Sequence, residues 1–155
     1  MCCWEVSLNK RNSKEKYMAV ITEYIHLSTR GNADVIDVTS DINEKLQRLS
    51  VKNGLAVVMV IGSTGALTTC EYEPGLVEDI KEIFDKLIPA GSYHHDRAWG
   101  DGNGHSHLRS SLVGPSLTIP FNNKRLILGT WQQVIFIDFD NRERERKLVL
   151  QVIGE

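Results

Sequence analysis

The longest uninterrupted apolar stretch in this chain is the seven-residue run from Leu55 to Ile61, which lies between Gly54 and Gly62. A run of this length is typical of a central strand whose two faces are both buried. It is far shorter than the roughly 20 apolar residues that a membrane-spanning helix requires. We therefore expect a globular fold built around this strand, and no membrane partner.

Two amphipathic segments flank the run and are predicted to be helices. Residues 41–51 carry apolar side chains at helical spacing, and Thr39 or Ser40 is available to cap the first turn. The second segment follows Pro74 and is ended by Pro89. Its apolar stripe comprises Leu76, Ile80, Ile83, Phe84 and Leu87.

The remaining apolar segments have the alternation or the β-branched composition of strands. Before the first helix they are Trp4 to Asn9, Tyr17 to Thr29 and Val35 to Val38. After the second helix they are Leu117 to Phe121, Leu126 to Leu128, Val134 to Phe139 and Lys147 to Ile153. A hairpin turn is expected at residues 122–124. This order predicts an α+β fold, an antiparallel or mixed sheet with two helices packed on it, in a single domain over residues 1–155.

Charge and cysteine content limit the classes of function. The formal net charge is −2, which gives no general field for binding nucleic acid. The chain has three cysteines, Cys2, Cys3 and Cys70. An odd number, with two of them adjacent, does not form a disulfide framework, so a cytoplasmic protein with reduced thiols is expected. Cys70 is interpreted as a small buried residue in preference to a catalytic thiolate, which would need a neighbouring base.

Four of the five histidines lie in one polar segment, predicted to be a loop from His94 to His107. In an extended segment the side chains of His105 and His107 would point the same way. We therefore consider a divalent metal site, Zn²⁺ or Mg²⁺, with His95, His105 and His107 as ligands and Asp101 or Glu71 as further candidates. Asp101 and His107 are also candidates for proton transfer. The alternative is a hydrogen-bonded loop whose histidines satisfy backbone groups.

Several further residues suit the binding of a phosphorylated molecule. Ser63 and Thr64 follow the central strand in a glycine- and hydroxyl-rich turn, where backbone N–H groups can face an anion. Arg109 and Ser110 offer a guanidinium and a hydroxyl. Thr130 and Trp131 lie between two predicted strands and are candidates to line a pocket. The alternatives are a tight turn, a surface charge and a core tryptophan. Residues 142–147, whose charges alternate in sign, are interpreted as a solvated turn.

The chain closely resembles the YjbQ-like family, which is long labelled uncharacterised and is also called "secondary thiamine-phosphate synthase enzyme". Two segments carry the resemblance most specifically: Ser116-Leu117-Thr118-Ile119-Pro120 and Gly129-Thr130-Trp131-Gln132-Gln133-Val134. Other similar segments are residues 63–68 with Glu71, residues 101–108 and residues 151–155. The resemblance therefore covers almost the whole chain.

The resemblance implies an α+β fold and a homotrimer, or a higher assembly, with pockets at the junctions between subunits. It also implies a thiamine-phosphate synthase activity, which joins a pyrimidine diphosphate to a thiazole phosphate and releases pyrophosphate. The chain departs from the family pattern at Gly62 and Gly100, where many members carry a histidine. His95, His105 and His107 are then the histidines that the resemblance carries over.

Two classes of function are consistent with these residues. The first is a metal-assisted transferase or hydrolase acting on a small phosphorylated molecule. The second is a trimeric module that binds a metal or small ligand without catalysis. Both use the same residues, so turnover discriminates between them.

Overall fold

The structure is a computed structural model that describes residues 17–155, so the strand expected at Trp4 to Asn9 lies outside the described residues. It has an α+β fold in which every strand pairing is antiparallel. One sheet has five strands in the order β1-β8-β3-β5-β6, and the other has three in the order β2-β7-β4. The strands are β1 (Ala19–Thr29), β2 (Asp34–Asp37), β3 (Gly54–Val60), β4 (Gly65–Cys70), β5 (Ser116–Asn122), β6 (Arg125–Leu126), β7 (Gln133–Asp138) and β8 (Arg144–Gly154).

The predicted central strand is confirmed as β3, which pairs with both β8 and β5. Its alternate residues Ala56, Val58 and Val60 are buried in the main core. Phe136 of β7 and Leu148 of β8 pack in the same cluster, so this core joins the two sheets. The longest apolar run in the sequence thus forms an interior strand of the larger sheet.

Both predicted helices are present, with small differences at their ends. Helix α1 (Thr39–Arg48) buries Ile42 and Leu46 in the main core. The expected cap is wrong, because Thr39 is already helical and its hydroxyl accepts a hydrogen bond from Val134 N at 2.8 Å. Helix α2 (Pro74–Leu87) is capped by the Glu73 carboxylate and packs Val77, Ile80 and Phe84 against the three-stranded sheet.

Two further helices replace the loop predicted from His94 to His107. They are α3 (His94–Trp99) and α4 (Gly104–Val113). The Asp96 carboxylate accepts hydrogen bonds from Tyr93 N at 2.9 Å and from Gly104 N at 2.8 Å, so one side chain satisfies a backbone donor at the start of each helix. Gly100 ends α3 in a left-handed conformation, φ +69°. The loop prediction was wrong because these short helices have no long apolar stripe.

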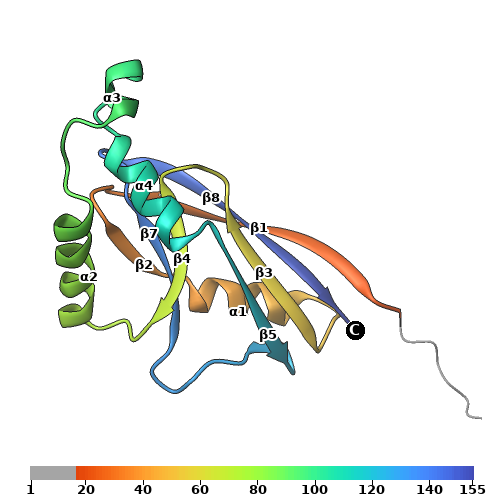
Figure 1. The fold of residues 1–155 in the computed structure, drawn as a ribbon. Helices are drawn as coiled ribbons and strands as arrows, with labels where there is room; N and C mark the ends of the chain where they lie inside the picture. The colour runs from red at the N-terminus through yellow and green to blue at the C-terminus, as the bar shows by residue number, and fades with distance from the viewer. Residues whose placement is uncertain (1–16) are drawn as a thin grey trace, which may run out of the picture.

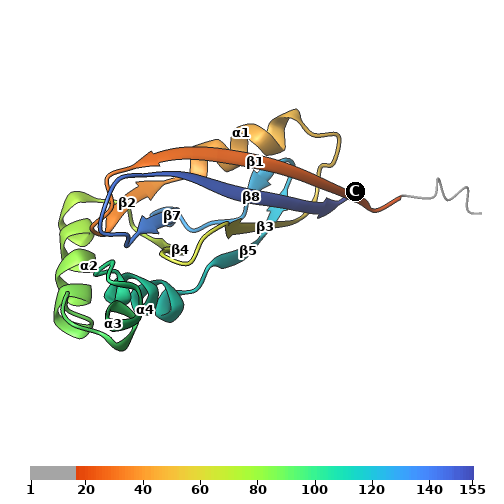
Figure 2. The same cartoon turned by 90° about the horizontal axis from the view of Figure 1, so that it is seen from above.

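The helices α2, α3 and α4 gather at one end of the molecule, opposite the C-terminal end of β8 (Figures 1 and 2). The turn between β3 and β4 and the start of β8 lie at this same end (Figure 1). No helix in the described part of the chain is long and apolar enough to cross a membrane. The fold therefore brings the histidine-rich segment, the glycine-rich turn and the residues after β7 together.

Candidate functional site

The turn between α3 and α4 brings together a histidine from each helix and an aspartate between them. The possible ligand atoms of His95, Asp101 and His107 all lie within 4.8 Å of one another. His95 Nε2 is 3.6 Å from Asp101 Oδ1, and the two imidazole centroids are 4.5 Å apart. Two imidazoles and one carboxylate are a donor set that first-row divalent ions bind. We call these residues the triad.

Each imidazole of the triad has a nitrogen that makes no hydrogen bond. His107 Nδ1 lies 3.1 Å from the backbone carbonyl oxygen of Ser63. Because a carbonyl only accepts, Nδ1 must carry the proton, and Nε2 then holds a lone pair in the neutral ring. His95 Nε2 is buried and has no hydrogen-bond partner. A buried nitrogen without a hydrogen bond is costly unless something binds it, so a metal ion fits this triad.

His105 does not belong to the triad, contrary to the expected extended geometry. The segment is helical, and residues two apart on a helix differ by about 200° in direction. The His105 side chain is buried near Arg109, and its Nε2 lies 3.4 Å from the Ser106 hydroxyl. Burial, followed by the positive charge of Arg109, lowers the pKa of His105. Asp101 therefore takes the place that the extended geometry gave to His105.

Next to the triad lies a buried ionic cluster, formed by Asp138, Asp140 and Arg146 with Thr64. The Arg146 guanidinium donates to both oxygens of Asp138, at 2.6 and 2.7 Å, and to the Thr64 hydroxyl at 2.7 Å. Asp138 and Asp140 are almost completely buried. The Thr64 hydroxyl donates to Asp140 Oδ2 at 2.9 Å. The cluster thus fixes the 63–64 turn, whose carbonyl holds His107.

The predicted solvated turn at residues 142–147 is wrong in its second half, which begins β8. Alternate residues of a strand point to opposite faces. Arg146 therefore points inward with Leu148, whereas Glu145 is exposed. Charges that alternate in sign also occur in exposed turns, so this pattern does not reveal that Arg146 is buried. The only sequence signal for a buried ion pair was the presence of two acidic residues nearby, Asp138 and Asp140. The sequence interpretation missed this cluster.

Part of the cluster and part of the triad line one cavity of about 340 Å³, which we call the ionic pocket. Burial raises the pKa of Asp140, but hydrogen bonds from Arg144 and Thr64 and the charges of Arg144 and Arg146 outweigh it, so the pKa lies below its ordinary value. Asp140 Oδ1 and Asn103 Oδ1 are buried acceptors without a partner. The lining consists of Gly62, Ser63, Thr64, Asp101, Asn103, His107, Asp140, Arg144, Glu145 and Arg146.

Only two of the residues predicted to bind phosphate lie at this pocket, Ser63 and Thr64. Arg109 is buried, and its guanidinium bonds the Ile88 carbonyl at the end of α2 and Asp85 at 2.8 Å. Ser110 donates to the Gly65 carbonyl at 2.6 Å. These bonds hold α4 to α2 and β4. Thr130 and the largely exposed Trp131 lie in the turn before β7, and neither lines the ionic pocket.

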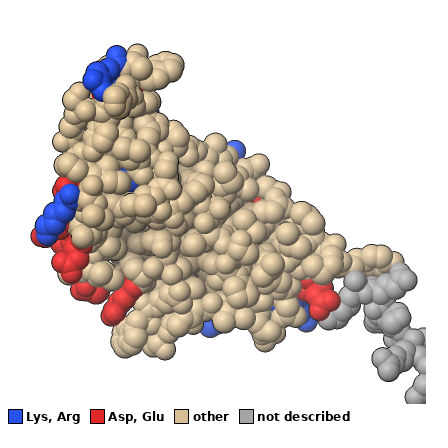
Figure 3. All heavy atoms as spheres, viewed as in Figure 1, with Lys and Arg blue, Asp and Glu red and all other residues tan. Residues whose placement is uncertain are grey.

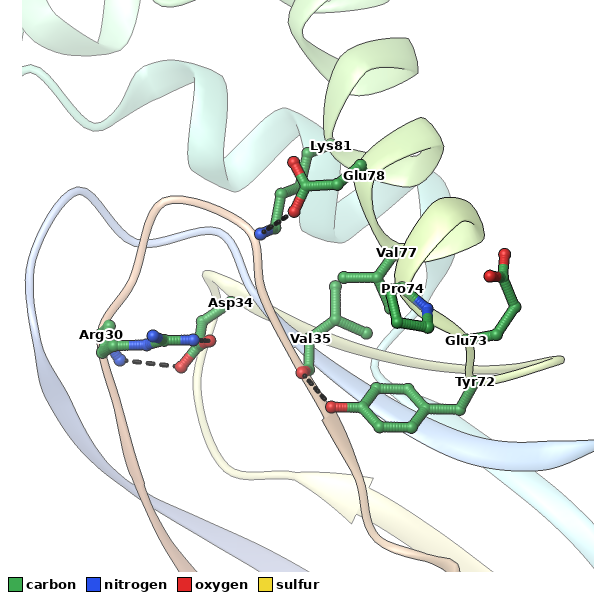
Figure 4. Close-up of a pocket in the computed structure, with 9 residues that line it drawn as sticks. All are labelled: Arg30, Asp34, Val35, Tyr72, Glu73, Pro74, Val77, Glu78 and Lys81. Carbon is green, nitrogen blue, oxygen red and sulfur yellow. Dashed lines mark hydrogen bonds and ion pairs between the residues drawn. The ribbon is translucent and has the colours of Figure 1, made fainter.

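Two other features are weaker candidates for chemistry. A 320 Å³ hollow lies between β2 and the start of α2 (Figure 4), but its ionic side chains are paired: Arg30 with Asp34 and Lys81 with Glu78, at 2.8 and 3.0 Å. The Tyr72 hydroxyl donates to the Val35 carbonyl there. Burial, followed by the charges of Asp37 and Glu71, raises the pKa of Cys70, so its thiol stays protonated.

The chain is similar in sequence to one family of known proteins. Residues 23–155 match the family model described as "UPF0047 protein YjbQ-like". A UPF0047 protein of Archaeoglobus fulgidus is 37% identical over 124 residues, which is 79% of this chain and 94% of that protein. The UPF0047 protein YugU of Bacillus subtilis is 31% identical, over 84% of this chain and 97% of that protein.

Solved structures agree with these sequence relatives. A YbjQ-like protein of unknown function from Sulfolobus solfataricus superposes with a TM-score of 0.83 at 27% identity, covering 90% of this chain and all of that one. A hypothetical protein from Aeropyrum pernix gives a TM-score of 0.80 at 38% identity, covering 87% of this chain and 99% of that one. The chain therefore belongs to the UPF0047 family of YjbQ-like proteins.

Proposed function

We propose that this protein is a metal-dependent enzyme that acts on a small phosphorylated molecule at the ionic pocket. The observation that carries the proposal is the triad, in which His95 Nε2 is buried without a hydrogen-bond partner within 4.8 Å of ligand atoms from Asp101 and His107. Three protein ligands leave a coordination position open for water or substrate, which is the arrangement of catalytic rather than structural zinc sites.

The donor set favours zinc over magnesium. Mg²⁺ prefers oxygen ligands, whereas imidazole nitrogen suits Zn²⁺ and its first-row neighbours. When bound, such an ion would polarise a phosphoryl oxygen or lower the pKa of a bound water. The Ser63 carbonyl orients the His107 ring through Nδ1, which is the usual role of a second partner behind a metal-binding histidine.

The charges of the ionic pocket make phosphate binding dependent on the metal. Its lining has two arginines, Arg144 and Arg146, and three carboxylates, Asp101, Asp140 and Glu145. With neutral histidines the formal charge is therefore negative until a divalent ion is added. Arg144 has the more exposed side chain of the two arginines, 33% against 9%, so we assign it the contact with phosphate.

The first experiment is metal binding followed by turnover. Protein prepared without metal is titrated with Zn²⁺, and the expected result is one ion per chain, lost in His107→Ala. His26→Ala is the matched control, because His26 is an exposed histidine on β1 outside the triad. Equal zinc affinity in all three proteins would refute the site.

The reaction itself is tested with the substrates that the family resemblance implies. Zinc-loaded protein is incubated with the pyrimidine diphosphate and the thiazole phosphate, and pyrophosphate release is measured. We propose this thiamine-phosphate synthase-like transfer as the first reaction to test. Release that disappears in His107→Ala supports it. Tight binding of both compounds without release would instead favour a binding module.

We also propose that copies of this chain associate, as a homotrimer, through the outer face of the five-stranded sheet. One row of this face is apolar across three strands: Leu55 of β3 pairs with Ile153 of β8, which pairs with Val20 of β1. Val20 and Leu55 are 69% and 44% exposed. Few charged side chains appear on the side that carries β3, β5 and α4 (Figure 3). Light scattering of wild type and Leu55→Glu tests this proposal, and a monomeric wild type would refute it.

A further inference from the structure

The triad lies between two cavities of different character. On one side is the ionic pocket, to which Asp101 and His107 contribute. On the other side is a cavity of about 220 Å³, which we call the apolar pocket. His107 lines both. The apolar pocket is formed by Tyr93, His94, His95, Gly104, His107 and Leu108.

The lining of the apolar pocket presents rings and an aliphatic side chain, and no Lys, Arg, Asp or Glu. The hydroxyl of Tyr93 is already engaged, because it donates to the Pro89 carbonyl at 2.7 Å. Leu108 is 48% exposed. An exposed leucine beside an aromatic ring and three imidazoles favours a flat apolar group, which can stack on the rings and cover the leucine.

The floor of the apolar pocket depends on the absence of a side chain at Gly104. A Cβ there would lie 2.6 Å from Tyr93 Cβ and 3.1 Å from each carboxylate oxygen of Asp96. Such contacts would push Tyr93 and α3 away from α4. The glycine therefore permits the close approach of the two helices that forms both the pocket and the triad.

We infer that the substrate is a phosphate monoester carrying a single aromatic or heteroaromatic ring. Its phosphate would bind at the ionic pocket and its ring at the apolar pocket, with the triad between them. The apolar pocket is somewhat larger than the cavity of about 150 Å³ that holds one benzene ring. This inference rests on the proposed function and adds the class of substrate.

The inference is tested with methyl phosphate and benzyl phosphate as matched probes of the zinc-loaded protein, by calorimetry. Benzyl phosphate is expected to bind on the order of tenfold more tightly, because an open pocket buries only part of the ring. Leu108→Gln should remove most of this preference while leaving zinc and methyl phosphate affinity unchanged. Leu112→Gln is the control, since Leu112 is an exposed leucine of the same helix that does not line the pocket.

The possible failures are distinguishable. If zinc does not bind, the proposed function and this inference fall together. If zinc and methyl phosphate bind but benzyl phosphate binds no more tightly, only the inference is overturned. A preference that survives in Leu108→Gln, or that is lost equally in Leu112→Gln, also overturns it, because the ring would then bind elsewhere.

Discussion

Replacing Arg146 with methionine removes the cation from the buried ionic cluster while keeping similar side-chain volume. Both oxygens of Asp138 then lose their guanidinium donors, and Asp138 keeps the Thr29 hydroxyl at 2.5 Å and the backbone N–H of Asp140 at 3.0 Å. Breaking a buried ion pair by removing one partner costs about 3–5 kcal/mol. We expect Arg146→Met to lower the free energy of unfolding by about that amount.

That loss is large enough to measure by two methods. An entropy of unfolding of about 2.1 cal/mol/K per residue over 155 residues gives about 0.3 kcal/mol/K, so the melting temperature should fall by about 9–15 °C. In urea, an m-value of about 2 kcal/mol/M converts a loss of about 4 kcal/mol into a midpoint lower by about 2 M. Far-ultraviolet circular dichroism follows both transitions.

The matched control is Arg142→Met, the same chemical change at an exposed position before β8. It should change the free energy of unfolding by no more than about 0.5 kcal/mol. A loss below about 1 kcal/mol in Arg146→Met would refute the reasoning. So would equal losses in the two variants.

Three further predictions concern acid stability, Arg109 and Gly104. The pKa of Asp140 is depressed in the folded chain, so its contribution to the free energy of unfolding is complete above the unfolded value of about 3.9 and is lost as pH falls toward the folded value. Acid titration followed by circular dichroism should therefore show a smaller loss of stability over this range in Asp140→Asn than in the wild type. Arg109→Met should lower the melting temperature, because Arg109 donates hydrogen bonds to the Ile88 carbonyl. It should leave the affinity of the zinc-loaded protein for methyl phosphate unchanged, and weaker binding would show that Arg109 contacts the phosphate after all. Gly104→Ala should weaken zinc binding by separating α3 from α4, whereas Gly91→Ala, where an added Cβ meets nothing within 4 Å, should not; equal zinc affinity in both would contradict the packing argument.

Apolar periodicity predicted most of the fold. It identified β3 from an uninterrupted run and α2 from a stripe bounded by Pro74 and Pro89, because burial and backbone restriction act locally in both. Helix α3 was missed because its boundaries depend on a carboxylate, Asp96, that also bonds the first residue of α4. That second contact crosses a turn whose path is not encoded in any repeating pattern.

The sequence pointed to the segment that forms the candidate site, but it did not predict which of its side chains lie together. The segment from His94 to His107 supplies the whole triad, yet which histidines meet depends on the left-handed turn at Gly100 and Gly102. The role of Arg146 could not be predicted, because a buried arginine and an exposed one can both lie in a segment whose charges alternate in sign. Only the turn that leads from β7 into β8 places it next to Asp138.

The long strand β8 supplies Arg146 to the ionic cluster and is an interior strand of the five-stranded sheet, in one register. It pairs residue by residue with β1, from Arg144 opposite Thr29 to Gly154 opposite Ala19. An insertion or deletion of one residue inside β8 would exchange its two faces, bringing Glu145 or Lys147 beside Asp138 and turning core leucines outward. Between β7 and the end of β8, we therefore expect changes of chain length to be tolerated only in the exposed turn at residues 141–143, before this pairing begins.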